Sequence, residues 1–411
     1  TVERRLANSF GPRPRRIVRV VGSTFSVQQC AFELSSQSDS GTQPPRTEIV
    51  VIDSLCCAEG ASSNSSLLLA AHWPIVKSTK ESWLSELKWS SQGSLYLGFE
   101  HLVDFGANET FQVNDGANWQ RVWNTVYDTK QFQKITFPPS SPKSLNEAWP
   151  QEYDNKSLTY LDIRSGSGGL PGCPIEKLPA PPDGASQRRG AGVAFRPQMP
   201  PSFYKPNEPT AIKKVDLAKQ DLGAIINSND WPSGTLIEAV GSGLRSMTPA
   251  TINSKDLRII FQQAPGVPLK LQPKSADSKG ANVSSLFLVS EGSLELTNAS
   301  IEASSVARPG NPSWLVESTN STLVFNGCRL QGSDTDASQH RGLIRWMTTI
   351  PILNNLRTPT LICMDSYLAS IGCGIRVEAE QGNLILKNSI IAIRGDGLDL
   401  RPVRSGAMIR P

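Results

Sequence analysis

An eight-residue unit recurs along this chain and constrains its fold more than any other feature. Two apolar residues stand two apart, Asn or Asp follows two positions later, and an apolar residue comes three positions after that, as in Leu294-x-Leu296-x-Asn298-x-x-Ile301. The same spacing returns at residues 25–32, 49–56, 361–368 and 384–391. The first two apolar side chains share one face of a strand, and Asn or Asp favours a sharp turn. The unit therefore predicts a strand, a tight turn and a second strand that returns to the same core.

The residue at the turn position varies in a way that points to the backbone. Gly327 fills this position in residues 323–330, and Gln29 fills it in residues 25–32. Glycine accepts a positive φ angle without steric cost. We therefore expect the position to be selected for its backbone conformation and not as a ladder of ligands.

Units that return at intervals of roughly twenty to thirty residues are typical of a solenoid. A β-propeller would show a regular period of about forty residues, and a leucine-rich repeat would show a denser leucine consensus. A β-sandwich would not repeat the turn position. Parallel strands need covered faces, and a closed coil supplies them. The sequence thus predicts an all-β chain that forms a parallel β-helix.

A longer similarity relates the two ends of the chain. Residues 22–30 resemble 320–328 and residues 47–54 resemble 359–366, both at an offset of about three hundred positions. We interpret this as two incomplete β-helix portions, the back part of one helix followed by the front part of another. The predicted segments are a basic tail at 1–16, the C-terminal portion of a first β-helix at 17–137, an extended Pro/Gly-rich linker at 138–211, and an N-terminal cap helix with the coils of a second β-helix at 212–411.

Local composition supports these boundaries. About half of the 30 prolines fall in the linker, which has too little apolar surface to fold alone. After it, apolar residues at partial helical spacing predict the cap helix, which Asp230-Trp231-Pro232 ends; they are Val215, Leu217, Leu222, Ile225 and Ile226. Before the linker, Trp119, Trp123 and Tyr127 share a helical face and predict a lid over one end of the core.

The composition of the chain excludes several classes of protein. A net charge of +4 and a pI near 8.6 are too mild to indicate nucleic-acid binding. No apolar run approaches the length of a transmembrane helix, and the sequence shows no signal peptide. Because it starts at Thr1 without Met, we expect a processed product or an excised fragment.

Seven cysteines offer no metal site that can be read from spacing. They include no CxxC pair and no Cys/His pattern of a zinc site. Cys30, Cys56, Cys328 and Cys363 fall in or beside repeat units, where small apolar residues belong. We expect buried thiols, with disulfides left open.

Part of the second portion resembles a known family. Asp221-Leu222-Gly223, Gly234-Thr235-Leu236-Ile237-Glu238 and Lys255-Asp256-Leu257-Arg258-Ile259, followed by residues 264–268, are similar to the opening of pectate-lyase-like right-handed parallel β-helices. The chain resembles most the β-helix regions of large planctomycete serine/threonine protein kinases and related secreted-type proteins. The resemblance implies a right-handed coil and an extracytoplasmic or cell-surface location. The sequence itself has no glycine-rich phosphate loop, HRD or DFG motif of a kinase.

Enzymes of the resembled fold imply a Ca²⁺ site with an arginine base, or paired aspartates. The best match is residues 394–401, where Asp396 and Asp399 lie between Arg394 and Arg401, although a surface turn has the same composition. A predicted loop at 333–358 holds Arg341, Arg345, Trp346 and Met347, and we favour packing of its tryptophan over sugar stacking. The three isolated histidines are expected to be surface or packed residues; they are His72, His101 and His340.

No residue is therefore assigned to catalysis, to cofactor binding or to a metal. The sequence favours a non-catalytic β-helix scaffold or binding module from the extracytoplasmic region of a larger protein, with carbohydrate or another protein as its partner. The alternative is a carbohydrate-active enzyme, a polysaccharide lyase or hydrolase on a pectate-lyase-like fold.

Overall fold

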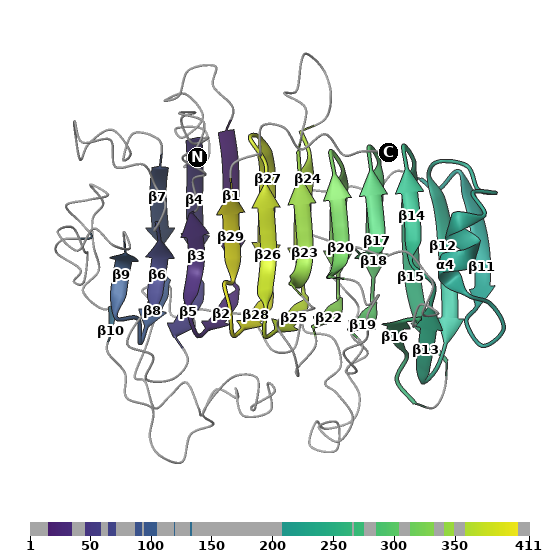
Figure 1. Ribbon diagram of the computed structural model, residues 1–411, viewed down its shortest axis with the longest axis horizontal. Coiled ribbons are helices and arrows are strands. Elements are labelled where there is room, and N and C mark those ends of the chain that lie inside the picture. The colour runs from purple at the N-terminus through teal and green to yellow at the C-terminus, as the bar shows by residue number, and fades with distance from the viewer. Residues whose placement is uncertain are drawn as a thin grey trace.

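The computed structural model describes residues 15–34, 46–58, 65–70, 87–92, 94–104, 119, 132–133, 208–264, 267–274, 285–303, 313–332, 341–348 and 358–401. These residues form three long sheets whose strands all pair in parallel, and the fold class is confirmed as an all-β parallel β-helix (Figure 1). Each of nine coils contributes one strand to each sheet, here named A, B and C, and β11 (Ala211–Asp216) and β10 (Phe132–Gln133) add a single strand at the two ends.

The strands stack in the following order. Sheet A runs β11 (Ala211–Asp216), β12 (Thr235–Gly241), β15 (Asp256–Gln263), β18 (Ser293–Thr297), β21 (Thr322–Asn326), β24 (Thr360–Met364), β27 (Gly382–Lys387), β1 (Arg15–Val21), β4 (Arg46–Ile52) and β7 (Leu87–Gln92). Sheet B runs β13 (Leu244–Met247), β16 (Lys270–Pro273), β19 (Ser300–Glu302), β22 (Arg329–Gln331), β25 (Tyr367–Ser370), β28 (Ile390–Ile393), β2 (Thr24–Val27), β5 (Leu55–Ala58), β8 (Leu95–Leu97) and β10 (Phe132–Gln133). Sheet C runs β14 (Ala250–Asn253), β17 (Ser285–Ser290), β20 (Trp314–Thr319), β23 (Gly342–Met347), β26 (Cys373–Glu378), β29 (Leu398–Arg401), β3 (Cys30–Leu34), β6 (Ser66–Leu69) and β9 (His101–Asp104).

The two β-helix portions meet in the middle of this stack. Strand β27 pairs with β1, β28 with β2 and β29 with β3, so the coils of residues 211–401 are followed by those of residues 15–104. Figure 1 shows the yellow strands of the C-terminal portion beside the purple strands of the N-terminal portion. The sequence predicts two different β-helices, but in this structure the two portions are consecutive parts of one solenoid. We call the contact of β27–β29 with β1–β3 the junction.

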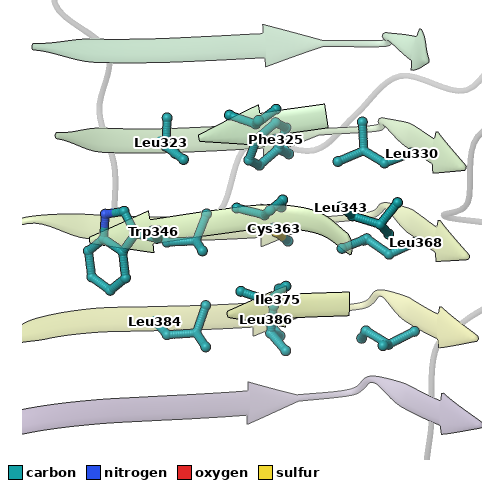
Figure 2. Close-up of a cluster of buried hydrophobic side chains, with 14 of the residues drawn as sticks. Leu323, Phe325, Leu330, Leu343, Trp346, Cys363, Leu368, Ile375, Leu384 and Leu386 are labelled. Atoms are coloured by element: carbon teal, nitrogen blue, oxygen red, sulfur yellow. The ribbon is translucent and has the colours of Figure 1, made fainter. Parts of the chain in front are cut away.

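The core is a set of apolar columns inside the coil. In sheet A, Phe325 lies in register with Cys363 and Cys363 with Leu386, and all three are fully buried (Figure 2). The column continues across the junction because Leu386 pairs with Val20. Alternate residues of each strand supply these inward side chains, which is the spacing of the repeat unit.

A ladder of buried serines follows the turn between sheets A and B. The backbone N–H of Ser366 donates to Ser389 Oγ at 3.3 Å, that of Ser389 to Ser23 Oγ at 3.2 Å, and that of Ser23 to Ser54 Oγ at 3.2 Å. Each hydroxyl donates in turn to the carbonyl oxygen two residues earlier, at 2.6–3.1 Å. The ladder crosses the junction between Ser389 and Ser23 without a break.

The turn position of the repeat unit has the backbone that the sequence predicts. Six residues of the turn from sheet A to sheet B have φ between 46° and 62°: Gly22, Asp53, Asn298, Gly327, Asp365 and Asn388. A second column at the turn from sheet C to sheet A, with φ of 51–53°, went unrecognised in the sequence because its residues are Ser254, Glu291 and Asn320. Backbone conformation, shared by residues of different chemistry, thus defines both columns.

The copy of the unit at residues 25–32 lies at a different turn of the coil from the other copies. Phe25 lies in sheet B and Phe32 in sheet C, so this unit spans the next turn of the coil. Gln29 is not among the residues with positive φ. The similarity of residues 22–30 to 320–328 therefore matches a sheet B strand with a sheet A strand, whereas residues 47–54 and 359–366 both contain sheet A strands.

Different devices close the two ends of the stack. Helix α4 (Leu222–Asn227) starts after Asp221, whose Oδ1 accepts from the N–H of Gly223 at 2.9 Å. At its other end, the Asn227 side chain donates to the carbonyl oxygen of Pro249 and accepts from the N–H of Thr251 in strand β14. Val215, expected in this helix, lies in strand β11, so the cap helix is shorter than predicted. At the other end Trp119 is buried against Trp89, with ring centroids 5.2 Å apart. Trp123 and Tyr127 lie outside the described residues.

No helix among the described residues is long and apolar enough to cross a membrane.

Candidate functional site

Three charged residues singled out in the sequence, Arg345, Asp399 and Arg401, lie together on the outer face of sheet C. Glu317 pairs in register with Arg345, Arg345 with Arg376, and Arg376 with Asp399, which places them in one column across four strands. Glu378 and Arg401 stand two residues further along their strands and pair with each other. We call these six residues the charged ridge. It holds three arginines and three carboxylates, so its formal net charge is zero.

Arg345 is held between two glutamates. Its Nη1 lies 2.9 Å from Glu317 Oε1, while its Nε and Nη2 lie 3.0 and 2.9 Å from the two oxygens of Glu378. Burial disfavours the charged guanidinium, but the hydrogen bonds and charges of Glu378 and Glu317 outweigh burial and raise the pKa of Arg345. A guanidinium fixed in a fork by two carboxylates is poorly suited to abstract a proton from a substrate.

Asp399 is the most buried carboxylate of the ridge. Its side chain is 0% exposed, and its oxygens accept from Arg376 Nε at 2.6 Å and from Arg401 Nε at 2.8 Å. Burial raises the pKa of Asp399, against the opposing effect of the two arginines. Arg376 also lies over the ring of Trp314, 5.2 Å from its centroid, and that tryptophan is itself buried. The pair therefore offers no open aromatic face on which a sugar could stack.

The two aspartates of residues 394–401 do not converge on a cation. Asp399 belongs to the charged ridge. Asp396 lies elsewhere, and its Oδ1 accepts from the Cys30 thiol at 3.2 Å at the start of strand β3. No group of three or more His, Cys, Asp and Glu side chains among the described residues is arranged to hold a metal ion. The segment is a turn into strand β29, which was the other interpretation of its composition.

Trp346 and its neighbours form a strand and not a loop. Residues Gly342–Met347 are strand β23, and Trp346 is 1% exposed with its Nε1 donating to the carbonyl oxygen of Ser321 at 3.0 Å. Gly342 and Gly382 leave room for two tryptophan rings, because an added Cβ would come within 2.4 Å of Trp314 and Trp346 respectively. The favoured packing role of Trp346 is what the structure shows.

The six cysteines of the described residues lie in the interior. Six are buried free thiols, and Cys173 lies outside the described residues. Burial raises the pKa of all five whose shift is resolved, to about 12 for Cys328. For Cys30 the nearby Asp396 adds to this effect. Since the thiolate is the reactive form, these residues are not poised as nucleophiles.

His101 is the one isolated histidine among the described residues. It pairs in register with Ser66, but the Ser66 hydroxyl donates to Asp104 Oδ2 at 3.5 Å. In a nucleophilic triad the serine proton goes to the imidazole, which the carboxylate orients from its other side. This arrangement places the carboxylate on the serine instead.

Comparison with known proteins identifies no family for this chain. No protein-family model matches the chain. No curated protein sequence matches it. Among solved structures, an arginine-to-alanine mutant of AlyGC, a PL6-family alginate lyase, is similar at 8% sequence identity with a TM-score of 0.24. That match covers 93% of this chain and 56% of the lyase, so the chain spans little more than half the length of the structure it matches.

Proposed function

We propose that this chain is a non-catalytic β-helix scaffold or binding module. The observation that supports the proposal is the mutual neutralisation of the charged ridge. Each of its arginines has a carboxylate partner within 2.9 Å, and the most buried carboxylate is shared by two arginines. Charged groups arranged in this way stabilise the outer face of a sheet and have few free lone pairs or protons for a substrate.

General acid–base chemistry on a polysaccharide needs the opposite arrangement. A hydrolase places two carboxyl groups about 5–10 Å apart across an open site, one protonated and one ionised. A lyase base must reach the proton that it removes. In the ridge, the carboxylates that a sugar would have to approach are already bound by Arg345, Arg376 and Arg401.

The setting that we propose is the extracytoplasmic region of a larger protein. The resemblance to secreted-type β-helix proteins supports this location, and a carbohydrate or another protein is the partner class that fits a rigid coil with long connections. A solenoid presents such connections at fixed intervals along one axis. The connections between β19 and β20 and between β23 and β24 lie largely outside the described residues, and they are the parts on which we would expect a partner to act.

A polysaccharide turnover assay tests this function. The protein is incubated with alginate, polygalacturonate and pectin, with and without Ca²⁺, while the ultraviolet absorbance of unsaturated products and the release of reducing ends are followed. We expect no turnover in any condition. Turnover that Arg376→Ala abolishes, and that Arg258→Ala leaves intact, would place catalysis on the ridge and contradict the proposal. Arg258 is the matched control because it forms an equivalent ion pair with Glu295 at 2.8 Å on sheet A.

A further inference from the structure

The junction completes the solenoid without a peptide bond crossing it. Residues of β27–β29 and β1–β3 lie nearly four hundred positions apart, yet their strands pair in all three sheets. Side-chain hydrogen bonds also cross it: the N–H of Ser389 donates to Ser23 Oγ at 3.2 Å, and Arg16 Nη1 donates to the carbonyl oxygen of Arg401 at 2.9 Å. The surfaces on its two sides are therefore complementary parts that the chain brings together through a long connection.

That connection has to return along the whole solenoid. The N-terminal portion ends at β10 and the C-terminal portion begins at β11, on opposite ends of the stack (Figure 1). Sheet A runs over nine intervals from β11 to β7, and β10 stacks on β8 one coil further, so ten intervals of about 4.8 Å give a span of about 48 Å. Residues 134–210 provide the connection, and a chain of that length has an r.m.s. end-to-end distance of about 48 Å.

The end-to-end distance of the connection is close to the distance that it has to cover. It therefore determines whether the junction forms within one chain or between two chains. A random coil of that length would present one portion to the other at an effective concentration of about 1 mM. A second copy offers the same complementary surface at its own solution concentration. The strand pairs are identical in the two cases, so the free energy of the junction does not affect the equilibrium between the closed monomer and the exchanged dimer. The length of the connection alone sets that equilibrium.

We propose that the junction is also an interface for a second copy of this chain, through which two copies exchange portions and complete two solenoids. The β1–β3 edge of one chain then pairs with the β27–β29 edge of its partner, and the reciprocal contact closes the dimer. At micromolar concentration the closed monomer dominates. At about 0.1 mM roughly a tenth of the chains are exchanged, and near 1 mM the two forms are comparable.

Two single-cysteine variants test the exchange. Val21 and Lys387 are register partners across the junction and both are half-buried. Neighbouring positions on paired strands have the Cα separation that a disulfide requires. Chains carrying Val21→Cys are mixed with chains carrying Lys387→Cys, both in a Cys173→Ser background, then unfolded, refolded together and oxidised. Only mixed dimers, half of those formed from an equal mixture, carry both cysteines at one junction. We therefore expect an interchain disulfide whose yield rises with concentration and approaches about a quarter of the chains near 1 mM.

Two double variants are the controls. Val21→Cys with Lys387→Cys in one chain should cross-link within the chain at micromolar concentration. Val21→Cys with Ile52→Cys joins register partners inside the N-terminal portion, and should cross-link within the chain at every concentration. If the first double variant cross-links but the mixed single variants never do, even at 1 mM, exchange does not occur and the proposal is overturned. If the first double variant fails to cross-link, the junction itself is wrong and the proposal falls with it.

Shortening the connection gives a second, independent test. Deleting residues 140–205 leaves eleven residues, which reach about 37 Å when fully extended and cannot span the solenoid. This variant should be a dimer at 1 µM by light scattering. Deleting residues 140–175 leaves a connection that still reaches, and this matched control should be a monomer. A folded monomer of the shorter variant would contradict the proposal; if that variant does not fold, the cross-linking of the full chain decides.

Discussion

Two adjacent interfaces of this solenoid differ in whether the polypeptide crosses them. The coil of β24–β26 continues into the coil of β27–β29 through residues 379–381, whereas the junction between β27–β29 and β1–β3 has no such connection. The first interface aligns five, four and four residue pairs in sheets A, B and C, and the junction aligns six, four and three. The serine ladder runs through both. Strand pairing and the stacking of like residues, more than chain connectivity, therefore specify which coil follows which.

Core truncation is expected to have the largest effect on both sides of the junction. Phe25 is fully buried in the first coil after the junction and stacks on Phe32 with ring centroids 5.5 Å apart, while Phe325 is fully buried within the continuous portion. Phe25→Ala and Phe325→Ala should each lower the free energy of unfolding by about 3–5 kcal/mol. Chemical denaturation should show one transition in both variants. Separate loss of the N-terminal coils in Phe25→Ala would show that the two portions fold independently.

A glycine column offers a matched pair for the comparison. Gly374 and Gly397 occupy equivalent positions in successive coils. An added Cβ at Gly374 would lie 2.6 Å from the carbonyl oxygen of Gly397, and one at Gly397 would lie 2.9 Å from that of Ala31, across the junction. Gly374→Ala and Gly397→Ala should each destabilise by roughly 1–3 kcal/mol, with the tighter Gly374 site losing more. An unaffected Gly397→Ala protein, measured by urea denaturation, would mean that the junction is looser than the interface before it.

The serine ladder predicts a smaller and nearly equal loss at the two interfaces. Ser366→Ala removes a hydroxyl that accepts from the N–H of Cys328 within the continuous portion, at 3.1 Å. Ser23→Ala removes one that accepts from the N–H of Ser389 across the junction, at 3.2 Å. Each change should cost about 1 kcal/mol, because a buried N–H loses its acceptor. Amide hydrogen exchange at residues 328 and 389 should accelerate in the corresponding variant only.

The smallest expected change in the free energy of unfolding comes from the charged residues, which differ between the two interfaces. Asp399 lies in register with Glu33 across the junction, so two carboxylates face each other there, whereas Glu378 pairs with Arg345 inside the continuous portion. Glu33→Gln should raise the free energy of unfolding at pH 7 by roughly 0.5 kcal/mol, since like charges on neighbouring strands repel. Glu378→Gln, which leaves Arg345 with one partner, should lower it.

The pH dependence of these variants has a definite sign. The pKa of Asp399 is raised above 3.8 by burial first, and Glu33 adds to the rise. Its contribution to stability is therefore fully present below its unfolded pKa and is lost as pH rises through its folded pKa. Glu33→Gln reduces the rise, so the wild type should lose more stability than the variant as the pH increases from about 4 to 7. The opposite trend in denaturation midpoints would mean that Glu33 is not a source of repulsion.

Sequence reasoning found the coil but not the order of its parts. The spacing of Leu294, Leu296 and Asn298 predicts a strand and a left-handed turn, and the structure has both. The same spacing at Phe25 belongs to another corner, because apolar periodicity reports an inward face without identifying the sheet. Within the candidate site, the packing of Trp346 could be predicted from its chemistry. The ion pairs of Arg345 could not, since their partners come from neighbouring coils about thirty residues away in sequence.

The junction was hidden for a related reason. The expectation of two β-helices rested on a similarity between distant repeats, and repeats of one solenoid resemble each other just as well. The serine after the turn was present in the sequence at Ser23, Ser54, Ser366 and Ser389, and it was the available sign that both portions share one ladder. Complementarity of two open ends is a property of stacked coils, and the one-dimensional pattern does not contain it.

A permuted chain tests whether the two portions form one solenoid. Residue 401 is joined to residue 16, the register partner of residue 382, by a copy of the Ala379-Glu380-Gln381 turn, which makes the same corner one coil earlier. The chain runs from 206 to 401 and then from 16 to 137. We expect a folded monomer with a single unfolding transition and an unchanged β-type circular dichroism spectrum. Its free energy of unfolding should be at least equal to that of the wild-type chain. A permuted chain that does not fold, or that unfolds in two independent transitions, would contradict a single solenoid built from both portions.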